Sequence, residues 1–174
     1  LPTMNIGQSG TGYFVQEASQ VTVNGTIYLG GNSNGGGHYN FKSGNLYADR
    51  ILTGEGSSSF TIVSGNLVTN EIDVSVSNES GSIRLPEGGE MLIITGNYEQ
   101  GELGELTLKV SGKELGEYQQ LKITGIATFS GTLKIVTTNE DVSFNIGDTL
   151  EIGDWLYQTG SFIDVELPRL PKTY

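Results

Sequence analysis

The tetrapeptide Ser-Gly-Asn-Leu occurs twice, at residues 43–46 and 64–67, an offset of 64 − 43 = 21 residues. An apolar residue, Phe41 or Ile62, stands two positions before each copy. A repeat period in the low twenties is typical of solenoids, in which each unit buries its apolar face only against its neighbours. We therefore expect the chain to return above its own starting point after about one such period.

Gly-rich turns recur with a similar spacing in the first third of the chain. Gly7 and Gly30 each precede an aromatic-bearing segment of alternating polarity. The Leu-x-x-Leu-x-Leu pattern and the helical return of leucine-rich repeats are absent. The predicted fold class is therefore all-β, a right-handed parallel β-helix (β-solenoid) with coils of about 21–25 residues.

The repeat also predicts which side chains stack on one another. In a parallel solenoid, equivalent residues of neighbouring coils lie about 4.8 Å apart. Stacked asparagines can in addition hydrogen-bond amide to amide along the ladder. The alternative is that both Ser-Gly-Asn segments are ordinary turns, where Gly and Asn are common. The matching apolar residues favour stacking, and the expected pairs are Phe41 with Ile62, Leu46 with Leu67, and Asn45 with Asn66.

Composition favours strands joined by many turns. The 174 residues include 26 glycines, and 17% of the residues are charged, against an average of about 25%. Abundant Gly, Ser, Thr and Asn beside Val, Ile and Leu suits strands and turns better than helices. In the second half, Leu106, Leu108 and Val110 alternate with polar residues, as in a half-buried strand. We find no segment with convincing helical spacing.

The distribution of charged residues divides the chain into a neutral first part and an acidic second part. Residues 1–50 hold two acids and two bases, so residues 51–174 carry the whole net charge of −11. The change falls in the Ser/Asn/Gly/Pro-rich stretch 75–89, where we expect altered coil geometry and no flexible linker. We therefore predict Gly-rich β-solenoid repeats over residues 1–80. A more acidic solenoid module, continuous with the first and truncated at its end, is predicted over residues 81–174.

The net charge and the amino-acid composition exclude several classes of function. A net charge of −11 with no basic stripe makes nucleic acid an unsuitable partner. The chain has no cysteine, which rules out disulfides, zinc–thiolate sites and thiol nucleophiles. No run of 18 apolar residues occurs, so we predict no membrane span in this chain.

Residues that could carry chemistry are few and scattered. The single histidine, His38, follows three glycines, and we expect an exposed turn residue there in preference to a ligand or a base. Acidic stretches occur at 70–73 and 139–141, followed by Asp148 and Asp154. We expect a solvated acidic face in preference to a metal site, although calcium binding by an acidic turn stays open. No catalytic, cofactor-binding or metal-binding residue is assigned.

Four tyrosines in the neutral first part raise a separate possibility. Tyr13, Tyr28, Tyr39 and Tyr47 lie in the predicted N-terminal coils. Exposed tyrosines aligned on one face of a solenoid stack well on sugar rings, because they combine an apolar ring with a polar tip. The alternative, which we favour, is that several of them are half-buried members of the ladders.

Four strand-like segments follow one another in the second half. They are LTLKVSG (106–112), GEYQQLKITGIATFSGTLKI (116–135), FNIGDTLEI (144–152) and GSFIDVELP (160–168). This order resembles the closing module of Gly-rich β-strand repeats in exported bacterial surface proteins of the PEP-CTERM type and in autotransporter passengers. The resemblance implies a parallel β-helix and a place on or outside the bacterial cell, and it implies no catalytic residue. Gln119 stands where that family usually has Asp, which leaves a turn role for the carboxylate open.

These features lead to one expected function and two alternatives. We expect a non-enzymatic structural or adhesive segment of a secreted or cell-surface bacterial protein. Its expected partners are extracellular polysaccharide or other surface proteins, and the open solenoid ends allow self-association. The alternatives are a carbohydrate-binding module with an aromatic groove and a polysaccharide-degrading β-helix enzyme.

Overall fold

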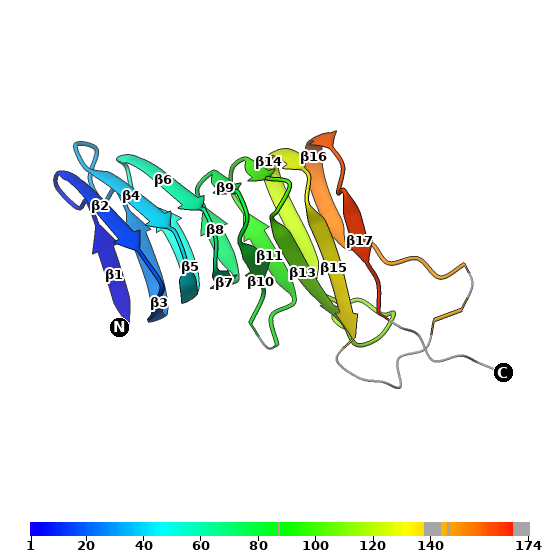
Figure 1. The fold of residues 1–174 in the computed structure, drawn as a ribbon. Helices are drawn as coiled ribbons and strands as arrows, with labels where there is room; N and C mark the ends of the chain where they lie inside the picture. Colours follow the sequence, from blue (N-terminus) through cyan, green and yellow to red (C-terminus); the bar gives the residue numbers. More distant parts are fainter. Residues whose placement is uncertain (87, 138–143, 146, 169–174) are drawn as a thin grey trace.

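A computed structural model describes residues 1–86, 88–137, 144–145 and 147–168 (Figure 1). This part of the chain contains 17 strands and no helix, and every ladder between the named strands is parallel. The all-β prediction is confirmed, and the strand pairing is that of a parallel solenoid. No helix of a length and hydropathy suited to crossing a bilayer occurs among these residues.

The strands form three faces, which the chain visits in the order A, B, C in each coil. Face A consists of β1 (Thr3–Ile6), the second halves of β3 (Ser19–Leu29) and β5 (Gly44–Thr53), β8 (Glu71–Asp73), β11 (Met91–Ile94), and the first halves of β14 (Gln120–Phe129) and β16 (Gly153–Gly160). Face B consists of β2 (Thr11–Gln16), β4 (Gly36–Phe41), β6 (Ser57–Ile62), β9 (Val76–Asn78), β12 (Tyr98–Gln100) and the second halves of β14 and β16. Face C consists of the first halves of β3 and β5, then β7 (Asn66–Val68), β10 (Ser82–Arg84), β13 (Glu105–Val110), β15 (Thr132–Thr137) and β17 (Asp164–Glu166).

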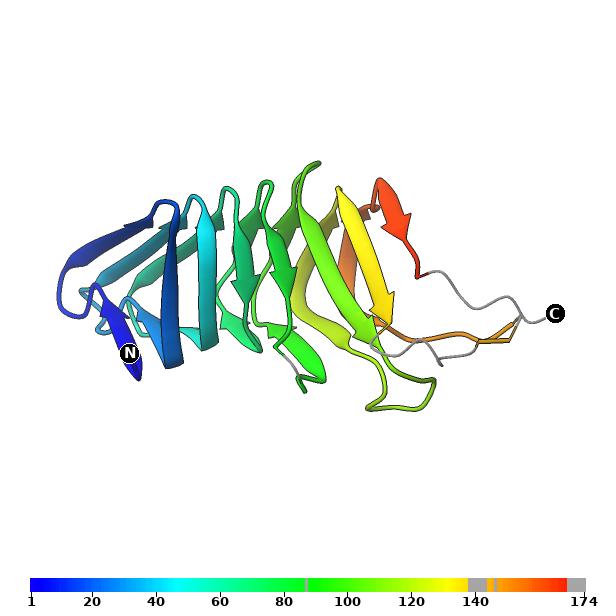
Figure 2. The same cartoon turned by 60° about the horizontal axis from the view of Figure 1, so that its bottom comes forward.

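Each face has seven levels in the described part of the chain, and the coils follow one another in a row (Figures 1 and 2). At about 4.8 Å a level, the row is about 29 Å long. Pairing continues through the middle of the chain, because β7, β8 and β9 pair with β10, β11 and β12. The repeats of residues 1–80 and the acidic segment that follows are thus joined by three ladders.

The register places the repeated tetrapeptide directly above its first copy. Asn45 is the Cα partner of Asn66 and Leu46 that of Leu67, which reproduces the 21-residue offset. The Asn66 Nδ2 donates a hydrogen bond to the Asn45 Oδ1 at 3.0 Å. The third predicted stack is present as well, since Phe41 pairs with Ile62. All three stacking predictions are confirmed.

The length of the coil varies more widely than the repeat predicts. The offset between Cα partners falls below the predicted range in one coil and exceeds it in the last coils. The shortest coil is the one that pairs Phe60 with Val76. The long ones include the steps from Leu92 to Leu121 and from Leu133 to Val165.

The added residues of the later coils lie where face C leads into face A. In the early coils β3 and β5 run from one face to the other without interruption. Later, residues 85–90 join β10 to β11 and residues 111–119 join β13 to β14. Both segments lie at the lower edge of the row of coils in Figure 1. We call this edge the C–A corner.

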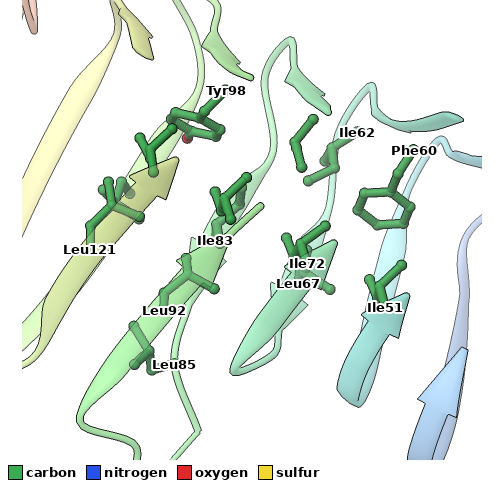
Figure 3. Packing of buried hydrophobic residues seen from close by; sticks show 14 of the residues in the cluster. Ile51, Phe60, Ile62, Leu67, Ile72, Ile83, Leu85, Leu92, Tyr98 and Leu121 are labelled. Atoms are coloured by element: carbon green, nitrogen blue, oxygen red, sulfur yellow. The ribbon is translucent and has the colours of Figure 1, made fainter. Parts of the chain in front are cut away.

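Three columns of inward side chains form the core. Alternate residues of a strand point to opposite faces, so parallel stacking without slippage brings like positions together. Figure 3 shows side chains of different coils directed into one interior. The column of face A is Met4, Ile27, Ile51, Ile72, Ile94, Ile123 and Trp155; that of face B is Phe14, Tyr39, Phe60, Val76, Tyr98 and Ala127; that of face C is Val21, Leu46, Leu67, Ile83, Leu106 and Leu133.

Burial of these columns supplies the main stabilisation of the fold. Ile27, Ile51, Ile72 and Ile94 are wholly buried. A fully buried isoleucine stabilises a fold by roughly 1.5–3 kcal/mol relative to an exposed one. Because each coil covers the apolar side chains of the coil before it, the core has the length of the row of coils.

The glycine of the repeated tetrapeptide is needed for the turn between faces B and C. Gly44 and Gly65 have φ angles of +98° and +99°, a left-handed region that L side chains rarely adopt. A Cβ on Gly65 would lie 2.7 Å from Phe41 Cζ and 2.8 Å from the Gly44 oxygen. The repeated glycine is therefore explained by the left-handed backbone of the turn, and the repeated Asn-Leu by the stacking of side chains.

Buried amide side chains bind the carbonyls of the same turns. Gln100 is 1% exposed, and its Nε2 donates to the carbonyl oxygens of Gly104 (3.0 Å), Ser130 (2.8 Å) and Thr132 (3.1 Å). Its Oε1 accepts from the Tyr98 hydroxyl at 2.7 Å, and burial raises the pKa of that hydroxyl. Gln16 and Asn78 occupy the same inward column and bond other turns of this corner. The end of face B thus combines buried amides with the buried apolar side chains of Phe41 and Ile62.

Candidate functional site

The single histidine lies on a strand and not in a turn, so the prediction of an exposed turn residue is wrong. His38 belongs to β4 and is half-buried. Its ring stacks on Tyr13 with the ring centroids 4.8 Å apart, and its Nδ1 lies 2.8 Å from the Ser59 Oγ. The preceding glycines begin the strand, where a Cβ on Gly37 would lie 2.5 Å from the Ile6 backbone oxygen in the coil before. Close contact with the coil before explains the glycines.

The His38–Ser59 pair lacks the third member of a catalytic triad. A serine nucleophile needs a base whose other ring nitrogen is oriented by a further group, and it needs oxyanion donors. Within the described residues no carboxylate bonds His38, and both side chains project outward from face B. The pair therefore acts as a contact between neighbouring coils.

The acidic stretches do not come together in the described part of the chain. Glu71 and Asp73 lie on β8 of face A, where their Cα partners are Arg50 and Leu52. Asp154 is on β16 and lies 3.8 Å from Lys122. Residues 139–141 are outside the described residues. Among the residues described, no group of three or more His, Asp or Glu side chains is placed to hold a metal ion.

Asp148 has a local structural role. The Lys113 ammonium forms a salt bridge with its Oδ2, which also accepts from the Asn145 backbone N–H at 2.7 Å. The Lys113 hydrogen bond and then the backbone hydrogen bond hold the pKa of Asp148 below its usual value. The carboxylate thus links Asn145 to Lys113 in segment 111–119 of the C–A corner.

The four tyrosines do not form one aromatic face. Tyr13 projects from face B, Tyr28 from face A and Tyr47 from face C. Tyr39 lies in the core at 1% exposure and donates to the Gln16 Oε1 at 2.6 Å. A groove built from these rings together is therefore absent, and the three outward-pointing tyrosines belong to three different faces.

Three cavities of the described residues lie at the C–A corner or beside it on face C. One of about 150 Å³ is polar, one of about 350 Å³ is mainly apolar, and one of about 260 Å³ combines apolar and basic side chains. The first is lined by Gly88, Gly89, Glu90, Lys109, Ser111, Gly116, Glu117, Tyr118 and Gln119; the second by Val110, Ile135, Phe144, Asn145, Asp148, Leu150, Leu167 and Pro168; the third by Tyr47, Val68, Arg84, Leu85, Pro86 and Lys109.

Gln119 fastens two segments of this corner together. Its Nε2 donates to the Gly89 carbonyl oxygen at 2.9 Å, and its Oε1 accepts from the Lys109 backbone N–H at 3.0 Å. An aspartate at this position lacks the N–H donor. The residue that departs from the pattern of the resembling family therefore has a structural reason to be an amide in this chain.

The sequence predicted altered coil geometry over residues 75–89 but did not indicate the C–A corner as a functional surface. The corner is the place where the coils lengthen, and long surface loops on a rigid scaffold are where binding residues concentrate. The available signal was the loss of the repeat after residue 85, together with Pro86 and the glycines that follow it. The corner is the candidate functional surface of this chain.

Comparisons with protein-family models, curated proteins and solved structures find no match for this chain.

Proposed function

We propose that this chain is a non-enzymatic structural or adhesive segment of a secreted or cell-surface bacterial protein. The observation that carries the proposal is the run of three inward columns along the described solenoid. A core of this kind makes a stiff rod whose length depends on the number of coils and not on a ligand.

Right-handed winding belongs to the proposal. A strand that leads by a crossover into a parallel neighbour of the same sheet does so with a right-handed connection in about 98% of cases. The parallel ladders of this chain are all of that kind. Coils of about 21–25 residues are proposed as the basic unit, to which the C–A corner adds further length in the later levels.

The outward surface of face B supports a role in contact with an aqueous, polar environment. Seven residues in register along this face are mostly small and polar, and Thr128 and Thr159 are joined by a hydroxyl–hydroxyl hydrogen bond of 2.9 Å. This outward column is Val15, Asn40, Thr61, Ser77, Glu99, Thr128 and Thr159.

The location and partners are proposed on the resemblance of residues 106–168 to exported bacterial surface repeats. That resemblance supports a place outside the cell or on its surface, with extracellular polysaccharide or other surface proteins as partners. Strand edges at the two ends of the solenoid would permit head-to-tail association of copies.

Two assays on the purified chain separate this function from its alternatives. We expect no release of reducing sugars or unsaturated products from pectin- or alginate-like polymers. Release that depends on the chain would contradict the proposal and favour the enzyme. A glycan array then separates an inert scaffold from an adhesive surface, and micromolar binding to one neutral glycan would favour a dedicated carbohydrate-binding module.

A further inference from the structure

The cavity of about 260 Å³ is a cleft on the outward side of face C. Tyr47, Val68 and Arg84 are Cα partners in three successive levels, and their neighbours Leu46, Leu67 and Ile83 point inward. Val68 is 8% exposed although it points outward. It therefore forms the floor of the cleft, between Tyr47 on one side and Arg84 on the other.

The dimensions of the cleft suit one sugar ring. Residues two levels apart are separated by about 9.6 Å, so Tyr47 and Arg84 flank a space of monosaccharide size. Sites for drug-sized ligands enclose about 300–1,000 Å³, and the cleft is slightly smaller. Leu85 and Pro86, the first residues of the segment after β10, add an apolar wall. The cleft is open to solvent along face C, as a subsite on a longer polymer must be.

The cleft presents an exposed cation on a chain that is acidic as a whole. The net charge is −11, yet Arg84 places a guanidinium in the described lining of the cleft. Arg84 is exposed and forms no salt bridge or side-chain hydrogen bond with any described residue. An exposed guanidinium beside an aromatic ring and an apolar floor is a surface that recognises an anion on a partly apolar ligand.

We propose that this cleft binds one carboxylated sugar unit, of the uronate class, in an extracellular polysaccharide. The Tyr47 ring stacks on the apolar side of the pyranose, and the Arg84 guanidinium donates paired hydrogen bonds to the sugar carboxylate. This inference rests on the adhesive form of the proposed function and names the chemistry of its ligand. It identifies the half-buried Tyr47, and neither Tyr13 nor Tyr28, as the sugar platform.

The test is a titration of the isotopically labelled full chain, followed by amide NMR shifts. The probes are methyl galactopyranosiduronate and its neutral counterpart, methyl galactopyranoside. We expect saturable shifts at residues 46–48, 67–69 and 83–85, with binding of the neutral sugar weaker by at least about tenfold. A hydrogen-bonded charge contributes on the order of 10- to 100-fold to affinity, so Arg84→Gln abolishes this discrimination.

Matched variants distinguish the cleft from general charge and aromatic content. Tyr47→Ala weakens binding of both sugars. Arg50→Gln and Tyr28→Ala, which change exposed residues of the same types on face A, leave binding unchanged. Arg84 is exposed, so Arg84→Gln retains the wild-type melting temperature and keeps the test valid even if Tyr47→Ala destabilises the fold.

Several results would overturn the proposal. One is the absence of saturable amide shifts at face C. Another is an Arg84→Gln variant that still prefers the uronate to the neutral sugar as the wild type does. The third is a loss of binding in the face A variants as large as in the cleft variants. N-acetylglutamate is the third probe: if it binds as tightly as the uronate, the cleft recognises a carboxylate alone, as in an acidic peptide. Failure of this test leaves the rod and its lack of polymer degradation untouched, so the two proposals fail separately.

Discussion

At the turn between faces B and C, the conformation of single residues sets where each coil can close. Gly44 and Gly65 are left-handed, and Ala18 in the first coil adopts φ = +50° without being glycine. A left-handed L residue costs about 1–2 kcal/mol. The second glycine is in addition confined by Phe41 and by the backbone of Gly44.

Gly65→Ala should therefore destabilise the protein by more than about 2 kcal/mol, because left-handed strain adds to steric contact. Urea unfolding followed by circular dichroism measures this. Gly10→Ala is the control, since Gly10 has no positive φ and a Cβ there meets no atom within 4 Å. Equal losses in the two variants would show that the turn is not confined as described.

The Glu17–Lys42 pair gives a pH-dependent prediction. Lys42 Nζ lies 2.7 Å from Glu17 Oε1, and this hydrogen bond, with the charge of Lys42, lowers the pKa of Glu17. A lowered folded pKa means that the stabilisation is present above the unfolded pKa. It is lost as the pH falls through the folded pKa.

Lys42→Gln should raise the pKa of Glu17 towards its ordinary value and reduce the loss of stability between neutral and acidic pH. Carboxyl carbon NMR shifts of Glu17 as a function of pH measure the first effect. Lys122→Gln removes a cation elsewhere and should leave the Glu17 titration unchanged. If the pKa of Glu17 were the same in the wild type and in Lys42→Gln, the contact between the two side chains would be contradicted.

Some residue-level features could be predicted and others could not. The Asn45–Asn66 hydrogen bond follows from the repeat, because identical neighbours at one coil spacing place the two amides side by side. The position of His38 on a strand could not be predicted, because a run of glycines is typical of a turn. In a solenoid, glycines at a strand start also permit close backbone contact between coils.

Among the elements, the turn from β12 to β13 and the turn from β14 to β15 share one buried amide. Gln100 bonds three carbonyls of two neighbouring coils and the Tyr98 hydroxyl. The period-two alternation of β12 places Gln100 inside the solenoid, where most other positions are apolar. The sequence alone therefore does not predict what this polar side chain binds. The carbonyls that need it are fixed only when the coils stack.

Gln100→Ala should destabilise the protein by about 3 kcal/mol, because each buried polar group left without a partner costs about 1–3 kcal/mol. The free energy of unfolding in urea is the measurement. Gln20→Ala provides the control, since Gln20 is exposed and makes only a long hydrogen bond of 3.4 Å to Thr22. A loss below about 1 kcal/mol at Gln100 would mean that water replaces the amide.

Alternation in the sequence located most strands but not the segments between them. Leu106, Leu108 and Val110 lie inward on β13, as predicted. Altered coil geometry was predicted for residues 75–89, but the contacts of the C–A corner were not. Residues 85–90 and 111–119 follow no repeat, and their contacts depend on single side chains such as Gln119. The candidate cleft was missed for a related reason: its two flanking side chains, on β5 and β10, are distant in the sequence and meet only through stacking.

For the whole molecule, stacked coils imply that one coil can be removed without loss of the fold. Deleting residues 45–65 joins Gly44 to Asn66 and restores the Ser-Gly-Asn-Leu sequence. β3 then faces β7 and β8, and β4 faces β9. We expect cooperative unfolding to persist with a lower midpoint, since stability is a sum over coils and their interfaces.

Deletion of residues 55–65, about half a coil, is the matched control. It removes β6 and leads face A directly into face C, so the inward columns lose their alignment. Circular dichroism and thermal unfolding compare the two proteins. Retained folding of the half-coil deletion, or complete loss with the full-coil deletion, would be incompatible with a solenoid.

Formation of one engineered disulfide tests the stacking most directly, because the chain contains no cysteine of its own. Asn45→Cys with Asn66→Cys places the two Cα atoms about 4.8 Å apart, inside the range that a disulfide spans. Asn45→Cys with Ser82→Cys uses the same column two levels apart, about 9.6 Å, beyond that range. Thiol titration of the oxidised, folded proteins should show complete pairing in the first variant and free thiols in the second. Free thiols in the first variant, or equal pairing in both, would contradict the parallel stack of coils.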